Sequence, residues 1–96
     1  MRRFFLVSYD IVNDKRRSRI AKLMLGYGER IQYSVFCCQL NQREILRLQE
    51  DIKQIIHTDE DQVLFLNAGK VIGQNPLPEL QYIGRTWIPE ARVQIV

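Results

Sequence analysis

A carboxylate and a group of arginines lie close together near the start of the chain. Asp10 ends the apolar run Phe4–Tyr9 and precedes a turn that contains Asn13. A carboxylate at the exit of a strand is held by rigid backbone and still reaches solvent, which suits a metal ligand or a general base. In the alternative interpretation, Asp10 accepts backbone N–H bonds and shapes the turn. This stretch alone leaves both interpretations open.

Positive charge is concentrated in the same part of the chain. Residues 1–30 hold eight basic and three acidic side chains, whereas the remainder holds six basic and eight acidic ones, and the net charge is +3. Clustered Lys and Arg are typical of a surface that binds a polyanion, most often nucleic acid. Arg16 and Arg17 fall in the first turn of an expected helix, where cations oppose the helix dipole. A bound phosphate would account for them, and a solvated helix face is the alternative.

The pattern of apolar residues in the first 40 positions predicts the strands and the helix that position these side chains. Residues 3–11 form a strand that is apolar on both faces, which is typical of a central strand. A helix follows from Asn13 or Asp14, and Gly28 is expected just after its end. The next long β-branched run, residues 30–40, is expected to split into two strands at a kink near Tyr33 and Ser34.

The second half of the chain predicts one more helix and two strands. Asn41 and Glu44 have the spacing of a capping box that opens a helix over residues 42–56. Residues 62–68 form a second strand that is apolar on both faces, and residues 80–83 form a short one. The acidic residues 59–61, between this helix and the strand at residues 62–68, are expected to be a solvated turn, and His57 a helix-end or surface residue.

The order of these elements predicts an α+β fold. We expect a ferredoxin-like βαββαβ sandwich over residues 1–84, with an extra C-terminal strand. Residues 85–96 carry several large apolar side chains and are expected to dock on the sheet or on a partner chain. Both helices cover one sheet face, so a homodimer packed through the other face is predicted.

Composition favours a cytoplasmic protein without a membrane segment. The chain of 96 residues has no signal-peptide pattern and no apolar stretch long enough to span a bilayer. Its two cysteines, Cys37 and Cys38, are adjacent, which is unsuited to a disulfide and too few for a zinc site. They are expected to be small, half-buried residues of a strand.

The chain resembles the small CRISPR-associated adaptation protein, also described as the CRISPR-associated endoribonuclease family. The resemblance covers residues 3–68 and depends on Tyr9-Asp10 after the first strand, the basic first helix, and the run from Arg30 to Phe36, RIQYSVF. It implies a homodimer that works with the larger CRISPR integrase subunit in inserting spacer DNA. It also implies a phosphodiesterase activity on RNA or DNA that depends on Mg²⁺, with Mn²⁺ as a substitute.

The resemblance also implies roles for individual residues. Asp10 and Tyr9 are the implied catalytic residues, and Asp10 is also the implied metal ligand. Phe36 and Ser34 are structural residues near the site, and Cys37 stands where many members of the family have an acidic residue. The predicted nucleic-acid-binding residues are Arg16, Arg17, Arg19 and Arg30.

Two functions remain open at this point, and they differ in the importance of Asp10. The first is a metal-dependent endonuclease, in which two copies of Asp10 can share a cation across the dimer. The second is a non-catalytic DNA-binding scaffold of the integrase complex. A small-molecule-sensing regulator is disfavoured, because the chain has a basic helix and lacks a glycine-rich ligand loop.

Overall fold

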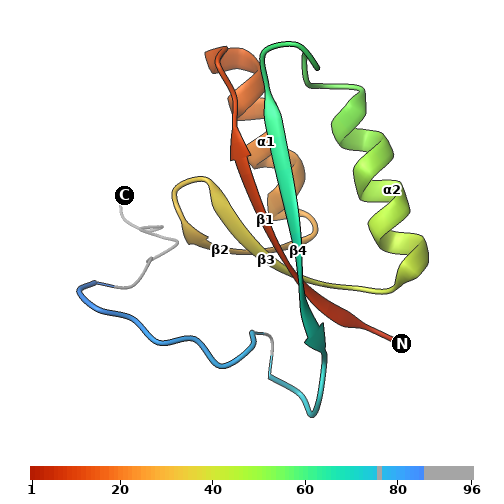
Figure 1. The fold of residues 1–96 in the computed structure, drawn as a ribbon, viewed down its shortest axis with the longest axis vertical. Helices are drawn as coiled ribbons and strands as arrows, with labels where there is room; N and C mark the ends of the chain where they lie inside the picture. The colour runs from red at the N-terminus through yellow and green to blue at the C-terminus, as the bar shows by residue number, and fades with distance from the viewer. Residues whose placement is uncertain (76, 86–96) are drawn as a thin grey trace.

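The computed structural model describes residues 1–75 and 77–85, and it folds their first 70 residues into one antiparallel sheet and two helices (Figure 1). The strand order is β2-β3-β1-β4, and every pair of neighbours is antiparallel. The elements in chain order are β1 Arg3–Asp10, α1 Asp14–Leu25, β2 Gly28–Gln32, β3 Val35–Leu40, α2 Gln42–Lys53 and β4 Gln62–Lys70. This order and topology confirm the predicted α+β class.

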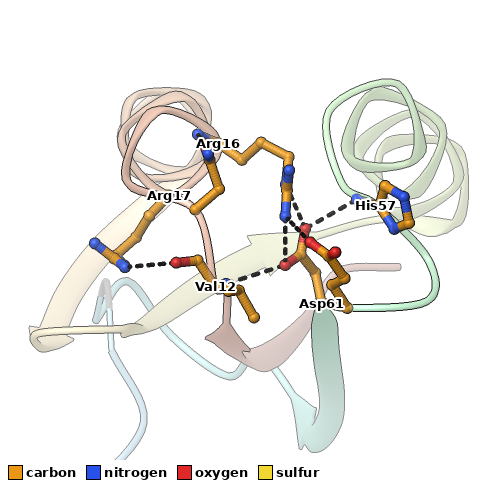
Figure 2. A network of polar contacts seen from close by, with 7 residues as sticks. Val12, Arg16, Arg17, His57 and Asp61 are labelled. Atoms are coloured by element: carbon orange, nitrogen blue, oxygen red, sulfur yellow. Dashed lines mark hydrogen bonds and ion pairs between the residues drawn. The ribbon is translucent and has the colours of Figure 1, made fainter.

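Strand β1 is central, as its two apolar faces predicted. It pairs with β3 on one side and with β4 on the other. Val7 and Tyr9 lie in the core with residues from both helices, so α1 and α2 cover the same sheet face (Figure 2). Side chains alternate along a strand, so Asp10 is directed to the opposite face from Tyr9 and is exposed.

Both helices begin at the predicted caps. The Asn13 side chain accepts a hydrogen bond from the Arg16 amide, and Asn41 and Glu44 form the full capping box. Helix α2 ends at Lys53, three residues before the predicted end at residue 56. Ile55 and Ile56 still pack against the core from the turn that follows, which explains why their periodicity resembled helix.

The predicted kink splits residues 28–40 into β2 and β3, with a turn at Tyr33 and Ser34. The prediction for Gly28 was wrong, because this glycine opens β2 and does not end α1. A Cβ atom on Gly28 would lie 2.4 Å from the carbonyl oxygen of Cys37 and 2.6 Å from Sγ of Cys38. The glycine is therefore required by the close approach of two strands.

The predicted strand at residues 80–83 is absent, so the described residues contain no extra C-terminal strand. Apolar composition favours a strand only where an edge is available in register, and these residues make no ladder with β2 or β4. Gln81, Tyr82 and Ile83 instead lie beside the turn between β2 and β3, with Ile83 fully exposed. The predicted docking of the tail, residues 85–96, falls almost entirely outside the described residues.

The sheet face away from the helices carries exposed apolar side chains on β4. Leu64 is 55% exposed and Leu66 is 59% exposed. Leu6 and Leu66 are register partners, so they share this face. The face is apolar enough to fit the predicted homodimer, which stays a prediction.

No helix within residues 1–75 and 77–85 combines the length and the apolar character needed to cross a bilayer.

Candidate nucleic-acid interface

A basic groove lies between α1 and the hairpin of β2 and β3, and we call it the α1–β2 groove. It is an open concavity of about 540 Å³. Three of the residues singled out from the sequence line it, namely Tyr9, Arg17 and Arg30. The complete lining is Tyr9, Asp14, Arg17, Ser18, Ala21, Lys22, Leu25, Arg30 and Tyr33. The fold thus brings together side chains from the end of β1, from α1 and from β2.

Aromatic rings hold Arg30 in the groove. Arg30 is the register partner of Phe36, and its guanidinium carbon lies 4.9 Å from the centroid of the Phe36 ring. It also lies 5.7 Å from the centroid of the Tyr33 ring, and Nη2 donates a 3.5 Å hydrogen bond to the Tyr9 hydroxyl. Phe36 itself is fully buried and stacks on Tyr9 at 6.3 Å. Its predicted structural role therefore fits its position beneath Arg30.

The guanidinium of Arg17 is held at the mouth of the groove by the start of its own helix. Nη1 donates a 2.6 Å hydrogen bond to Asp14 Oδ1, and Nη2 donates a 3.5 Å one to the carbonyl oxygen of Val12. The Asp14 side chain is 92% exposed, so solvent surrounds this ion pair. A phosphate can therefore reach Arg17 without a buried partner being broken.

The other two predicted arginines do not line the α1–β2 groove. Arg19 is exposed on α1 and is not part of the groove lining. Lys22 lines the groove instead, one helical turn after Ser18. The spacing of Ser18 and Lys22 could have revealed it, because positions i and i+4 share one face.

Arg16 is turned away from the groove and into an ion-pair network (Figure 2). Its Nε donates to Asp61 Oδ2 at 2.7 Å, and its Nη2 donates to Glu60 Oε1 at 2.9 Å. The guanidinium of Arg16 is therefore engaged within the chain, and its predicted contact with nucleic acid stays a prediction. The cause is long-range packing that brings the start of β4 beside the start of α1.

Asp61 corrects the prediction of a solvated acidic turn. Its side chain has 0% exposure, and its carboxylate also accepts hydrogen bonds from the backbone amides of Val12 and His57. The Arg16 guanidinium, followed by these amides, holds the pKa of Asp61 well below its usual range. The sequence pattern did not indicate that Asp61 is buried against Val12 and Arg16, next to the start of α1.

Asp10 does not line the α1–β2 groove, although its neighbour Tyr9 does. It is exposed at the end of β1, where it pairs with Gln62 of β4. Ser34 lies at the same end of the sheet, where its carbonyl oxygen accepts a 3.1 Å hydrogen bond from the Tyr9 amide. Within the described ranges, no three His, Cys, Asp or Glu side chains converge in a way that could hold a metal ion.

The cysteine thiols are more buried than predicted, and both are unsuited to metal binding. Cys37 and Cys38 are each 1% exposed. Burial, followed by the charge of Glu29, raises the pKa of Cys37 to about 11. Burial, followed by the neighbouring Cys37, raises the pKa of Cys38 to about 12. Both groups therefore stay protonated near neutral pH, and a thiolate is the form that binds metals.

In comparisons with known proteins, residues 1–71 match the model of the family described as "CRISPR associated protein Cas2". A CRISPR-associated endoribonuclease Cas2 of Geobacter sulfurreducens is 36% identical over 96 residues, which cover 100% of this chain and 99% of that relative. The crystal structure of Streptococcus pyogenes Cas2 matches with a TM-score of 0.67 and 30% identity, covering 84% of this chain and 99% of that one. A chain from a partial Cas6-RT-Cas1–Cas2 complex matches with a TM-score of 0.57 and 28% identity, and the match covers 81% of this chain and 99% of that one.

Proposed function

The chain belongs to the CRISPR associated protein Cas2 family, and from this premise we propose that it is an endonuclease that binds nucleic acid through the α1–β2 groove. The observation that carries the proposal is the convergence of Tyr9, Arg17 and Arg30 on one open groove. The Geobacter relative is named an endoribonuclease, which supports a phosphodiester substrate.

The α1–β2 groove has the chemistry of a phosphate-backbone site. Arg17, Lys22 and Arg30 supply three cations from two elements, and Asp14 is the single acidic residue of the lining. A guanidinium matches the geometry of a phosphate, and the ring stacking of Arg30 keeps its side chain from being disordered. Backbone contacts of this kind give affinity without sequence preference.

Asp10 is the residue we propose to hold a divalent cation. Asp10 is exposed, but its single carboxylate can hold Mg²⁺ or Mn²⁺ only if other oxygen atoms complete the coordination shell of the cation. Mg²⁺ commonly combines one or two carboxylates with water and substrate phosphates. Within our proposal, these oxygens come from the nucleic acid and from Asp10 of a second copy in a homodimer. When bound, such a cation supplies an activated water and stabilises charge on the phosphate.

Support for spacer integration is the second function that we propose. The structural match to a chain of a partial Cas6-RT-Cas1–Cas2 complex favours a larger integrase subunit as partner. In this role the α1–β2 groove would hold DNA for the partner, and Asp10 would be dispensable. Both proposed functions use the same basic surface. They differ in whether Asp10, at the end of β1, takes part in phosphodiester cleavage.

The binding part of the proposal is tested by salt dependence. Each phosphate contact that is lost flattens the slope of log K against log salt by about one unit. We expect this loss in Arg17→Ala and in Lys22→Ala, with single-stranded RNA and with duplex DNA. Lys53→Ala is the matched control, because Lys53 is 64% exposed at the end of α2 and does not line the groove. Equal slopes in all three variants would place the interface elsewhere.

The catalytic part is tested by Asp10→Ala. We expect turnover to fall by more than about 10³-fold while folding and nucleic-acid affinity persist. Asp59→Ala is the control, because Asp59 is an exposed acid in the loop before β4. Cleavage that persists in Asp10→Ala contradicts the catalytic role. Integration by the mutant together with the larger subunit, without cleavage by the wild type, favours the scaffold function.

A further inference from the structure

Asp61 binds three separate segments of the chain through one buried carboxylate. It accepts hydrogen bonds from the Val12 amide at 3.0 Å, the His57 amide at 2.9 Å and the Arg16 guanidinium at 2.7 and 3.2 Å (Figure 2). These donors belong to the turn after β1, the loop after α2 and the first turn of α1. A full set of partners on a buried charge is costly to disturb and fixes the geometry of all of them.

The backbone of Val12 is the point where this network meets the candidate site. Its N–H is held by Asp61, and its carbonyl oxygen accepts a hydrogen bond from Arg17 Nη2 at 3.5 Å. Val12 follows Asp10 by two residues. The turn between the proposed metal ligand and the proposed phosphate-binding arginine is therefore held on both sides.

A second connection reaches Asp10 along β4. Asp61 is followed directly by Gln62, which is the register partner of Asp10. The end of β1 is thus fixed by strand pairing through Gln62 and by the side chain of Asp61 through Val12. The ion pair of the half-buried Arg16 with the buried Asp61 keeps the start of α1 aligned with both.

We propose that Asp61, together with Arg16, is a positioning residue that keeps Asp10 and Arg17 in fixed geometry. The inference rests on the proposed nuclease function. Catalytic groups must be held within about 0.5 Å of the productive geometry by their supporting residues, so a loosened turn lowers turnover more than it lowers binding. Asp61 itself is buried and does not contact nucleic acid.

The test compares Asp61→Asn and Arg16→Lys with Glu60→Gln. Asp61→Asn keeps the size of the side chain but replaces an accepting oxygen opposite Arg16 Nε with a donor. Arg16→Lys keeps the charge and loses the two-point contact. Glu60→Gln is the matched control, because the Glu60 side chain is 51% exposed and makes only the outer ion pair with Arg16.

Three readouts separate positioning from simple destabilisation. We expect Asp61→Asn to lower kcat at least tenfold per folded molecule, to change the Kd for a single-stranded RNA less than threefold, and to weaken binding of Mn²⁺ alone. We also expect faster hydrogen exchange at the Val12 amide, with a smaller change in the same direction in Arg16→Lys. Glu60→Gln should resemble the wild type in every readout. If Asp61→Asn fails to fold, Arg16→Lys decides the matter through the same readouts.

Asp10→Ala in the same assays separates the two ideas. If Asp10→Ala retains turnover, the proposed nuclease site is wrong, and Val12 exchange and Mn²⁺ binding still test Asp61. If Asp10→Ala is inactive while Asp61→Asn and Arg16→Lys keep wild-type kcat and Val12 exchange, the positioning role of Asp61 is overturned and the nuclease proposal stands.

Discussion

Replacing Gly28 with alanine should separate β2 from β3 and displace Arg30. The new Cβ would lie 2.4 Å from the Cys37 carbonyl oxygen, 2.6 Å from Cys38 Sγ and 2.9 Å from Cys38 Cα. Two of these three atoms belong to the backbone and cannot rotate away. Relief therefore requires the strands to move apart and weakens their pairing.

The expected cost of Gly28→Ala is about 3 kcal/mol, at the upper end of the range for overpacked cores. This is a large share of the roughly 5–15 kcal/mol by which small domains are stable. At roughly 4–8 °C per kcal/mol for a domain of this size, the midpoint of thermal unfolding should fall by roughly 12–24 °C. Arg30 follows Gly28 on the same strand, so affinity for nucleic acid should fall several-fold as well.

Gly26→Ala is the matched control for Gly28→Ala. Its nearest neighbour would be the Leu23 carbonyl oxygen at 3.4 Å, and its φ of −80° suits alanine. We expect no loss of stability, and a gain of up to about 1 kcal/mol through the unfolded state. Urea unfolding followed by circular dichroism, with a check that the m-value is unchanged, measures both variants. A Gly28→Ala protein within about 0.5 kcal/mol of wild type would refute the close approach of β2 and β3.

Three further predictions concern electrostatics, capping and the thiols. Asp14→Asn removes the carboxylate that competes for Arg17, so nucleic-acid affinity at low salt should rise several-fold in filter binding, and an unchanged Kd would mean that Arg17 does not contact phosphate. Asn41→Ala breaks the capping box and should cost about 1 kcal/mol in urea unfolding; a change below the error of the measurement would argue against the cap. Cys37 and Cys38 should resist a disulfide reagent at pH 8 in the native state and react once unfolded. Burial raises the pKa values of the two thiols in the folded protein to about 11 and 12, from an ordinary 9.0. The unfolded chain therefore ionises first, so the contribution of the thiols to stability is present below pH 9.0 and is lost as the pH rises towards those values. A free energy of unfolding that stays constant from pH 8 to 10 would contradict this.

Much of the fold followed from local patterns. The two apolar faces of Phe4–Tyr9 indicated a central strand, and Asn41 with Glu44 marked the start of α2, because both signals depend on neighbours in sequence. Gly28 was misinterpreted for the same reason. A glycine after a helix resembles a cap locally, and only the pairing with Cys38 shows why a side chain is excluded there.

The candidate site was predicted in part, because its residues come from distant positions. Tyr9, Arg17 and Arg30 were singled out from the sequence and line one groove, and their roles in binding and catalysis stay predictions. The pairing of Arg16 with Asp61 could not be read from composition, since an acidic turn and a basic helix start look solvated until packing brings them together. This ion pair thus explains why Asp61 was missed as a buried residue, whereas nucleic-acid binding by Arg16 stays a prediction.

The central position of β1 has a consequence for the time at which the site forms during synthesis. β1 leaves the ribosome before the other strands of the sheet, whereas one of its neighbours, β4, is the last of the described strands to emerge. The contact of Asp61 with Val12 likewise joins late residues to early ones. Such non-local contacts form slowly and after the local ones. We therefore expect a nascent chain that ends before β4 to carry α1 as a basic segment without a fixed site, and nucleic-acid binding with a defined geometry to appear only when β4 docks on β1.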